Sequence, residues 1–362
     1  MKKTEDRKVL YLHGRPDPHK LHGRFAKSVG SEFEFVDFKL RWQDKNRSRL
    51  YIILSWIVCA FAYPRKKYDY FLIDNLHMAP ILMKKLGLIK KRQKLIVHMG
   101  SHTLYFMYSN WFTGLNAYLQ RFMLKNYDAV ICEGKMAEEL VTKILKEEAP
   151  KTYYTFLGPP AERAQTLLKI EPDLYGNNIL LISNGPVGFR KYYKGLDLMI
   201  KAFNRVAKSN NSLKFFIIGD WDKEVVEECT KLMDDDNKER LIFTGRVNDI
   251  EKYIESSSLY LHCSRGDAFP TSSIEAMTAG LVPVVSEWTG TKQIVEKIDK
   301  RLVVKLDESK IAERILWYFD LDHETKASLS EKSRIEAAHF TEEKSTLHYQ
   351  KVFEEIINNF EN

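Results

Sequence analysis

Two carboxylates eight residues apart, Asp267 and Glu275, flank a Phe-Pro-Thr-Ser-Ser turn in the stretch DAFPTSSIEAMTAGLVPVVSEWTG. An apolar run typical of a strand precedes this turn, and small and apolar residues typical of a helix follow it. The free N–H groups and the dipole of a helix start favour phosphate binding, and Glu275, one turn further on, is placed to accept hydrogen bonds from a ribose diol. The alternative is an ordinary N-cap with an acidic residue in the first turn.

A second candidate segment, GPVGFRKYYKG, follows the strand-like run NILLISN. Gly185 and Gly188 allow a close approach of the backbone to a ligand. Arg190 and Lys194 place two cations just before a helix-like segment. Paired cations at such a point suit a diphosphate leaving group without a metal ion. The alternative is a solvated basic turn.

His98 ends the strand-like run KLIVHMG, and His102 follows at i+4. No acidic or cysteine ligand accompanies this pair in the sequence, so we expect no zinc and no other cofactor. A histidine at a strand end either donates to a sugar hydroxyl or caps the sheet, and we favour the contact with a ligand. The four cysteines lack metal-ligand spacing and favour a reducing cytoplasm.

Strand-like and helix-like segments alternate along the chain in two sets, each with six β-rich apolar runs. This alternation predicts an α/β protein with two Rossmann-like domains, whose strands are parallel and covered on both faces. The Pro-, Gly- and polar-rich stretch 158–178 reads as the linker. We predict domains at 1–165 and 166–340 that face across a ligand cleft, and a final helix at 341–362 that packs on the first domain.

Charge is distributed unevenly along the 362 residues. Residues 1–160 hold 28 Lys and Arg against 15 Asp and Glu, whereas residues 161–362 hold 28 against 34. The basic half therefore predicts an anionic partner. Nucleic acid would suit this charge, but the sequence holds no recognisable nucleic-acid-binding motif.

The segment 180–290 resembles the retaining glycosyltransferases of family 4, which have the GT-B fold. That family carries two glutamates eight residues apart in the form EGFPxxxxEAMAAGxPVV, and this chain reads DAFPTSSIEAMTAGLVPVV. The family's Arg/Lys pair before a KG helix matches Arg190 and Lys194. Its GxV segment near the nucleotide base matches 245–247, and its Ser before the acidic loop matches Ser264. The chain departs from the family in having Asp267, one methylene shorter, at the first glutamate.

The resemblance implies a role for each matching residue. Lys194 and Arg190 would neutralise the donor diphosphate and Glu275 would hold the ribose, while Asp267 and His98 would contact the transferred sugar. The remaining donor-binding candidates are Gly185, Val247, Ser264, Phe269, Pro270, Thr271 and Ser272. The segment HGRPDPHKLHGRF after the first strand supplies the acceptor-binding candidates Gly14, His22 and Gly23.

The predicted function is a metal-independent, retaining transfer of a hexose from a UDP- or GDP-linked donor to a hydroxyl acceptor. A catalytically silent nucleotide-sugar-binding partner of another transferase is one alternative, motivated by Asp267. A sugar-nucleotide epimerase is another, and it would return an altered donor without any acceptor.

Two apolar segments lie in the basic half. The run at 50–63 is too short to span a bilayer, and we expect it to form a helix buried against the first sheet. The segment 102–125 has more aromatic residues than a core helix needs. Basic residues beside aromatic ones suit an anionic leaflet. The sequence thus predicts a cytoplasmic, peripheral protein with a lipid-linked glycan or glycolipid acceptor.

Overall fold

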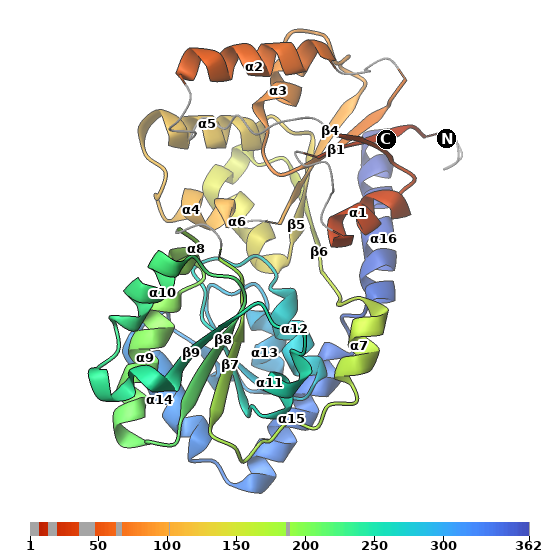
Figure 1. Cartoon of the computed structure of the whole chain (residues 1–362). Coiled ribbons are helices and arrows are strands. Elements are labelled where there is room, and N and C mark those ends of the chain that lie inside the picture. Colours follow the sequence, from red (N-terminus) through yellow and green to blue (C-terminus); the bar gives the residue numbers. More distant parts are fainter. Residues whose placement is uncertain are drawn as a thin grey trace. The chain divides into compact units, whose positions relative to one another are not determined.

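The computed structural model describes residues 7–13, 20–35, 48–62, 67–100, 102–185 and 189–361. The chain divides into two compact units (Figure 1). Unit 1 holds Met1–Phe156 and Ser345–Asn362, and unit 2 holds Leu157–Lys344. Each unit is built on a parallel six-stranded sheet, so the predicted α/β class with two Rossmann-like halves is confirmed.

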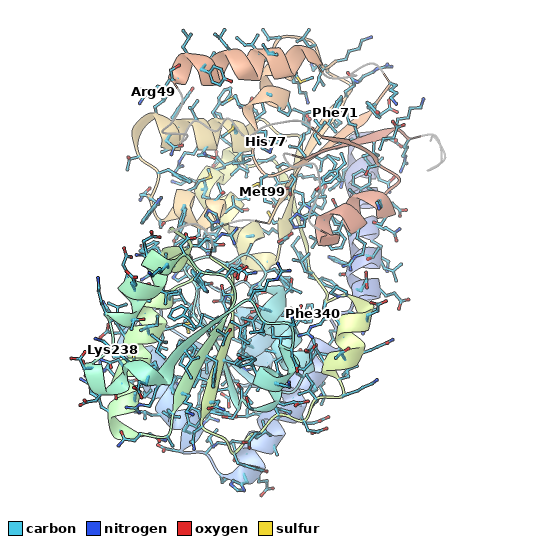
Figure 2. All side chains as sticks on the ribbon, in the orientation of Figure 1. Arg49, Phe71, His77, Met99, Lys238 and Phe340 are labelled. Atoms are coloured by element: carbon cyan, nitrogen blue, oxygen red, sulfur yellow. The ribbon has the colours of Figure 1, made fainter. Side chains whose placement is uncertain are left out.

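The sheet of unit 1 has the strand order β2-β1-β3-β4-β5-β6. Its strands are β1 Val9–His13, β2 Glu32–Phe35, β3 Tyr70–Asp74, β4 Lys94–Met99, β5 Ala129–Glu133 and β6 Lys151–Thr155. Its helices are α1 Lys20–Ser28, α2 Arg49–Ala62, α3 Met78–Lys85, α4 Thr103–Tyr108, α5 Gly114–Lys125, α6 Lys135–Leu145 and most of α16 Glu342–Glu361, with a 3₁₀ turn η2 at Lys146–Glu148. Phe71 and Met99 are buried, as expected for central strands covered on both faces (Figure 2).

Helix α16 returns to unit 1 at the end of the chain, as the sequence predicts. The ring of Tyr349 stacks on that of Phe25 with 4.5 Å between the ring centroids. His348 lies 3.0 Å from the carbonyl oxygen of Tyr154. These contacts attach the last helix to both α1 and the sheet.

The sheet of unit 2 has the order β12-β11-β10-β7-β8-β9. Its strands are β7 Asn178–Ile182, β8 Lys214–Ile218, β9 Leu241–Gly245, β10 Leu259–His262, β11 Val282–Ser286 and β12 Val303–Val304. Its helices are α7 Ala161–Leu167, α8 Phe189–Tyr193, α9 Leu196–Ser209, α10 Lys223–Thr230, α11 Glu251–Glu255, α12 Thr271–Thr278, α13 Lys292–Ile298, α14 Glu308–Phe319 and α15 His323–Ala337, with 3₁₀ turns η3 Asp235–Arg240 and η4 Lys300–Leu302. Helix α7 lies in the stretch that the sequence suggested as a linker, and Leu167 at its end is buried in the core of unit 2.

Helix α2 differs from the sequence prediction. A helix forms, but one apolar face of it, made of residues whose exposure the structure describes, is not buried against the sheet. Five of them recur at i, i+3, i+4, i+7 and i+8 and share one helix face, and all five are exposed: Leu50, Ile53, Leu54, Ile57 and Val58. Three aromatic residues of the next segment are exposed too: Tyr108 at the end of α4, Trp111 between α4 and α5, and Tyr118 on α5. Within the described ranges, no helix is long and apolar enough to cross a membrane.

Candidate functional site

The loops after β7 and β10 bring Lys194 and Asp267 together in unit 2. The Lys194 ammonium donates to Oδ2 of Asp267, and the two side chains are only 15% and 16% exposed. Burial disfavours a charged lysine, yet the neighbouring carboxylate outweighs burial and raises the pKa of Lys194. The site therefore holds a fixed positive charge at the carboxyl edge of a parallel sheet, where α/β proteins bind ligands.

His262, at the end of β10, completes this group and was not predicted from the sequence. Its Nε2 lies 3.0 Å from Oδ2 of Asp267, and its side chain is buried. Burial lowers the pKa of His262, so the neutral ring donates its Nε2 proton to the carboxylate. Burial alone would favour a protonated Asp267, but Lys194 and His262 hold the pKa of that carboxyl well below its usual range.

Two glycines let the loops of this site approach one another. Gly195 follows Lys194 with φ +73°, and a Cβ there would collide with the carbonyl oxygen of Cys263. A Cβ on Gly290 would collide with the carbonyl oxygen of Ala268. The N–H of Gly290 donates to the carbonyl of Asp267 at 2.8 Å. Both positions require glycine because backbone occupies the space that a side chain would need.

Ser264 supports the backbone of the acidic loop. Its Oγ accepts a hydrogen bond from the N–H of Asp267 at 3.1 Å. Its Oγ also lies 3.1 Å from Oγ1 of Thr289, which donates to the carbonyl of His262 at 3.0 Å. All these hydroxyl groups are buried. Ser264 therefore supports the position of Asp267, and the donor contact expected for it stays a prediction.

Glu275, on α12, lies beside a partner that sequence reasoning missed. Arg163 of α7 has its Nε 3.5 Å from Oε2 of Glu275, and its guanidinium also donates to Glu251. Burial raises the pKa of Glu275 despite the neighbouring arginine. The Glu275 side chain is 20% exposed, so it is not fully enclosed by its neighbours.

The residues between the two carboxylates begin helix α12. Phe269 is buried and packs its ring against Phe340, with 5.9 Å between the ring centroids. Pro270 is the N-cap residue and Thr271 begins the helix. The N–H of Ser273 donates to the carbonyl of Pro270 at 3.0 Å, whereas the N–H groups of the first two helical residues have no carbonyl acceptor one turn earlier within the helix. Ser272 accepts a hydrogen bond from the Tyr260 hydroxyl at 2.8 Å.

Three further donor-binding candidates lie elsewhere in unit 2. Gly185 packs its Cα against the ring of Trp221, and a Cβ there would collide with that ring. Arg190, on α8, has its Nη1 3.5 Å from the carbonyl of Asn184. Val247 is partly buried and packs against the hydrophobic core cluster that includes Ala276 of α12. Gly188 lies outside the described residues.

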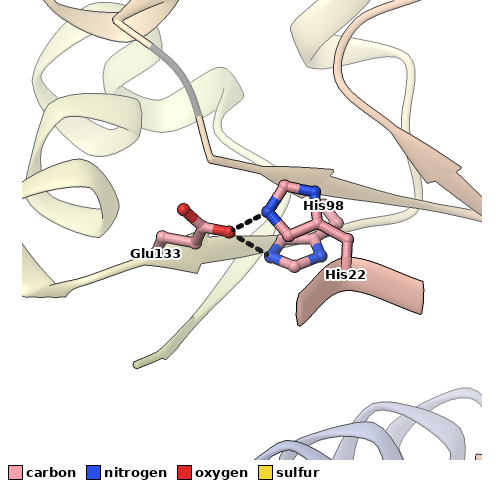
Figure 3. Close-up of side chains that lie close together, drawn as sticks. All are labelled: His22, His98 and Glu133. Carbon is pink, nitrogen blue, oxygen red and sulfur yellow. Dashed lines mark ion pairs between the residues drawn. The ribbon is translucent and has the colours of Figure 1, made fainter. Parts of the chain in front are cut away.

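The remaining predicted residues belong to unit 1. His98 is 1% exposed, with its Nε2 3.2 Å from Oε1 of Glu133 (Figure 3). The Nε2 of His22 lies 2.7 Å from the same oxygen, and the rings of the two histidines have centroids 4.9 Å apart. Gly23 is buried on α1. Gly14 lies outside the described residues.

This arrangement differs from the predicted sugar contact of His98, because that side chain is enclosed. The rings of Phe25 and Tyr349 lie 6.1 and 5.6 Å from its ring. His22, at 15% exposure, is the more accessible of the two histidines.

Comparisons with known proteins match the segment that holds this site. Residues 186–336 match the family model of the glycosyl transferases group 1. An uncharacterized glycosyltransferase of Haemophilus influenzae is 31% identical over 154 residues, which cover 41% of this chain and 42% of that protein. The match thus spans less than half the length of that relative.

Two solved structures resemble the whole chain. Sucrose-phosphate synthase from Thermosynechococcus elongatus has a TM-score of 0.71 at 15% identity, covering 98% of this chain and 100% of that one. The Anabaena protein HepE, solved in complex with UDP and glucose, has a TM-score of 0.68 at 15% identity and the same coverage. Residues 186–336, which hold Lys194, Asp267 and Glu275, thus match the group 1 glycosyl transferases within a chain that has the GT-B fold.

Proposed function

We propose that the protein is a glycosyltransferase that moves a hexose from a UDP- or GDP-linked donor to a hydroxyl acceptor with retention of configuration. The observation that carries this proposal is the buried pair of Lys194 and Asp267 beside the start of α12. An ammonium and a helix start suit an anionic diphosphate, and a carboxylate beside them suits sugar hydroxyls. The family match over the same residues supports this assignment.

In the proposed mechanism the chain stabilises the leaving group. Negative charge develops on the diphosphate as the sugar departs, and preorganised cations lower the energy of that transition state. The Lys194 ammonium has three protons, so it can keep its contact with Asp267 and also donate to a phosphate oxygen. Arg190 supplies a second cation. The departing phosphate takes the proton of the acceptor hydroxyl, so no side chain has to act as nucleophile or base.

The direct test is a panel of UDP- and GDP-sugars, screened for thermal stabilisation of the protein and for hydrolysis without acceptor. We expect one donor to raise the melting temperature and to be hydrolysed slowly, with the product configuration retained by NMR. Millimolar Mg²⁺ should not change the rate of donor hydrolysis, because cationic side chains neutralise the diphosphate. An inverted product, or turnover that requires Mg²⁺, would contradict the proposal. An altered sugar nucleotide returned without acceptor would instead indicate an epimerase.

Glu275→Gln should mainly weaken donor binding. A carboxylate accepts two hydrogen bonds from the ribose diol in both the ground state and the transition state, so its loss raises Kd more than it lowers kcat. The matched control is Glu251→Gln, which removes another acid that pairs with Arg163. Calorimetry with the donor found by the panel measures the donor Kd of both variants. An unchanged donor Kd for Glu275→Gln would exclude the ribose contact.

We further propose that the acceptor is lipid-linked and that unit 1 docks on the cytoplasmic face of a membrane. The support is the exposed apolar face of α2, in which Leu50 and Val58 are each 67% exposed. Helix α3 packs against α2, and the segment after α3 adds the exposed cations Lys90, Lys91 and Arg92. Exposed apolar residues and exposed cations in the same unit suit an anionic leaflet, to which each cation near the surface contributes about 1 kcal/mol.

Binding to anionic liposomes should be strong at low salt and largely lost by about 0.5 M salt, because screening removes the electrostatic attraction. Leu54→Glu/Val58→Glu, which places two charges on the apolar face of α2, should weaken binding at least tenfold. The control is Leu168→Glu, a change at a residue of unit 2 that is 57% exposed. Cosedimentation with vesicles measures the binding of the wild type, the double variant and the control variant. Equal binding to neutral and anionic vesicles, or none to either, would favour a soluble acceptor.

A further inference from the structure

The carboxyl ends of three neighbouring strands in unit 1 place polar side chains on one face of the sheet. Asp74 of β3 pairs in register with His98 of β4, and His98 pairs with Ile131 of β5. Glu133 lies two residues beyond Ile131, so it points to the same face as His98. Helix α1 brings His22 against this group.

The ring nitrogens of both histidines face a single carboxylate oxygen. Figure 3 shows the two imidazoles converging on Glu133, with Nε2 of His22 at 2.7 Å and Nε2 of His98 at 3.2 Å from Oε1. The three ligand atoms lie within 4.8 Å of one another. Two ligands of a tetrahedral zinc ion lie about 3.3 Å apart, given bonds of about 2.0–2.1 Å. The spacing therefore fits one ion with small adjustments.

The three side chains form a largely buried polar group. Nε2 of His98 and Oε1 of Glu133 are buried and lie 3.2 Å apart, within ion-pair distance. A buried carboxylate needs positive charge beside it, either on protonated imidazoles or on a cation that the three side chains share. Two imidazole nitrogens and a carboxylate directed at one point can hold a metal cation.

Two residues beside the cluster are also consistent with a metal site. Oδ1 of Asp74 lies 3.2 Å from Nδ1 of His22. A carboxylate at that position orients the ring through Nδ1 and directs Nε2 toward Glu133, as outer-shell acids orient histidine ligands at many metal sites. Gly100 leaves room for the third ligand, because a Cβ there would lie 2.5 Å from the Glu133 carboxylate.

We propose that His22, His98 and Glu133 bind one divalent transition-metal ion of the zinc class. Two imidazoles and one carboxylate suit Zn²⁺ and Co²⁺, whereas Mg²⁺ prefers oxygen ligands alone. Water would take the fourth position of a tetrahedral ion. The site goes beyond the proposed transfer reaction, in which Lys194 and Arg190 of unit 2 meet the diphosphate. It also departs from the expectation of no metal, which rested on the spacing of His98 and His102 and of the four cysteines.

The test is metal binding by the full chain, produced without a histidine tag. After removal of metal by a chelator, titration with Zn²⁺ should give about one equivalent bound per chain, and Co²⁺ should give the visible absorption of a tetrahedral site. Glu133→Gln and His22→Gln should weaken Zn²⁺ binding at least 100-fold. Asp74→Asn should weaken it by about 10–100-fold, as expected for a residue that orients a ligand.

Two controls separate this site from other histidines and from the donor site. His323→Gln changes a histidine of unit 2 that stacks on Tyr175, and it should keep one equivalent of metal. The Lys194→Ala variant should also bind one equivalent of metal, whatever its effect on sugar transfer. Circular dichroism of each metal-free variant checks its fold. Absence of saturable Zn²⁺ and Co²⁺ binding in the wild type, or unchanged binding in a folded Glu133→Gln variant, would overturn the proposal. The cluster would then be a proton-sharing network.

Discussion

Lys194→Ala should lower kcat/KM for sugar transfer by about 100-fold or more. One preorganised charge contact to the departing group in a closed site contributes roughly 3 kcal/mol to transition-state stabilisation. Lys194 is nearly enclosed, and its partner Asp267 fixes its direction, so little reorganisation is needed when charge develops on the diphosphate. Initial rates with the donor found by the panel, at low donor concentration, measure the effect.

Lys191→Ala is the matched control for that variant. Lys191 lies on the same helix, α8, and pairs with Glu228 on the surface of unit 2, so its loss should change kcat/KM less than twofold. Because Lys194→Ala also leaves Asp267 without its cation, its melting temperature has to be compared with that of the wild type. A folded Lys194→Ala protein that retains more than a fifth of the wild-type kcat/KM would exclude the phosphate role.

Much of the fold could be predicted from the sequence because parallel strands buried on both faces leave a strong local signal. Runs such as KLIVHMG and LVPVVSE are continuously apolar, and β4 and β11 form there. The location of Lys194 and Asp267 at one edge of the second sheet could be anticipated as well, since residues after parallel strands gather there. Their ion pair was not predicted.

Other parts of the sites depend on contacts between distant segments, for which the sequence holds no local pattern. Arg163 reaches Glu275 across 112 positions of the chain, and its helix begins in a stretch rich in proline that reads as a linker. Glu133 meets His22 only once α1 and β5 have packed in one unit. His262 ends a buried strand, and from the sequence a histidine there is as compatible with the core as with a functional site.

The exposed face of α2 could not be predicted either. An apolar run of that length is compatible with a core helix or with a helix on a membrane surface, and composition alone does not separate them. The helical spacing of Leu50, Leu54 and Val58 predicts a shared face. Only the structure shows that this face is uncovered.

Asp267→Asn should lower the free energy of unfolding of unit 2 by about 3 kcal/mol at pH 7. The change leaves a nearly buried ammonium without its counter-ion, which is the costly way to break a buried pair. A double-mutant cycle with Lys194→Met tests this reason. If the cost comes from the unpaired lysine, the double variant should be more stable than Asp267→Asn alone.

The pH dependence of this loss has a definite sign. The folded-state pKa of Asp267 lies below its unfolded value of about 3.9. The ionised carboxylate therefore stabilises the folded state fully above that unfolded value, and this contribution is lost as pH falls through the folded pKa. The difference in unfolding free energy between wild type and Asp267→Asn should thus be constant between pH 7 and about pH 5 and should shrink below about pH 4. Urea unfolding of both proteins at several pH values, followed by tryptophan fluorescence, measures it. A difference that grows on acidification would show that Asp267 is not held as a carboxylate by Lys194 and His262, and the same result would remove the fixed charge pair on which the donor site rests.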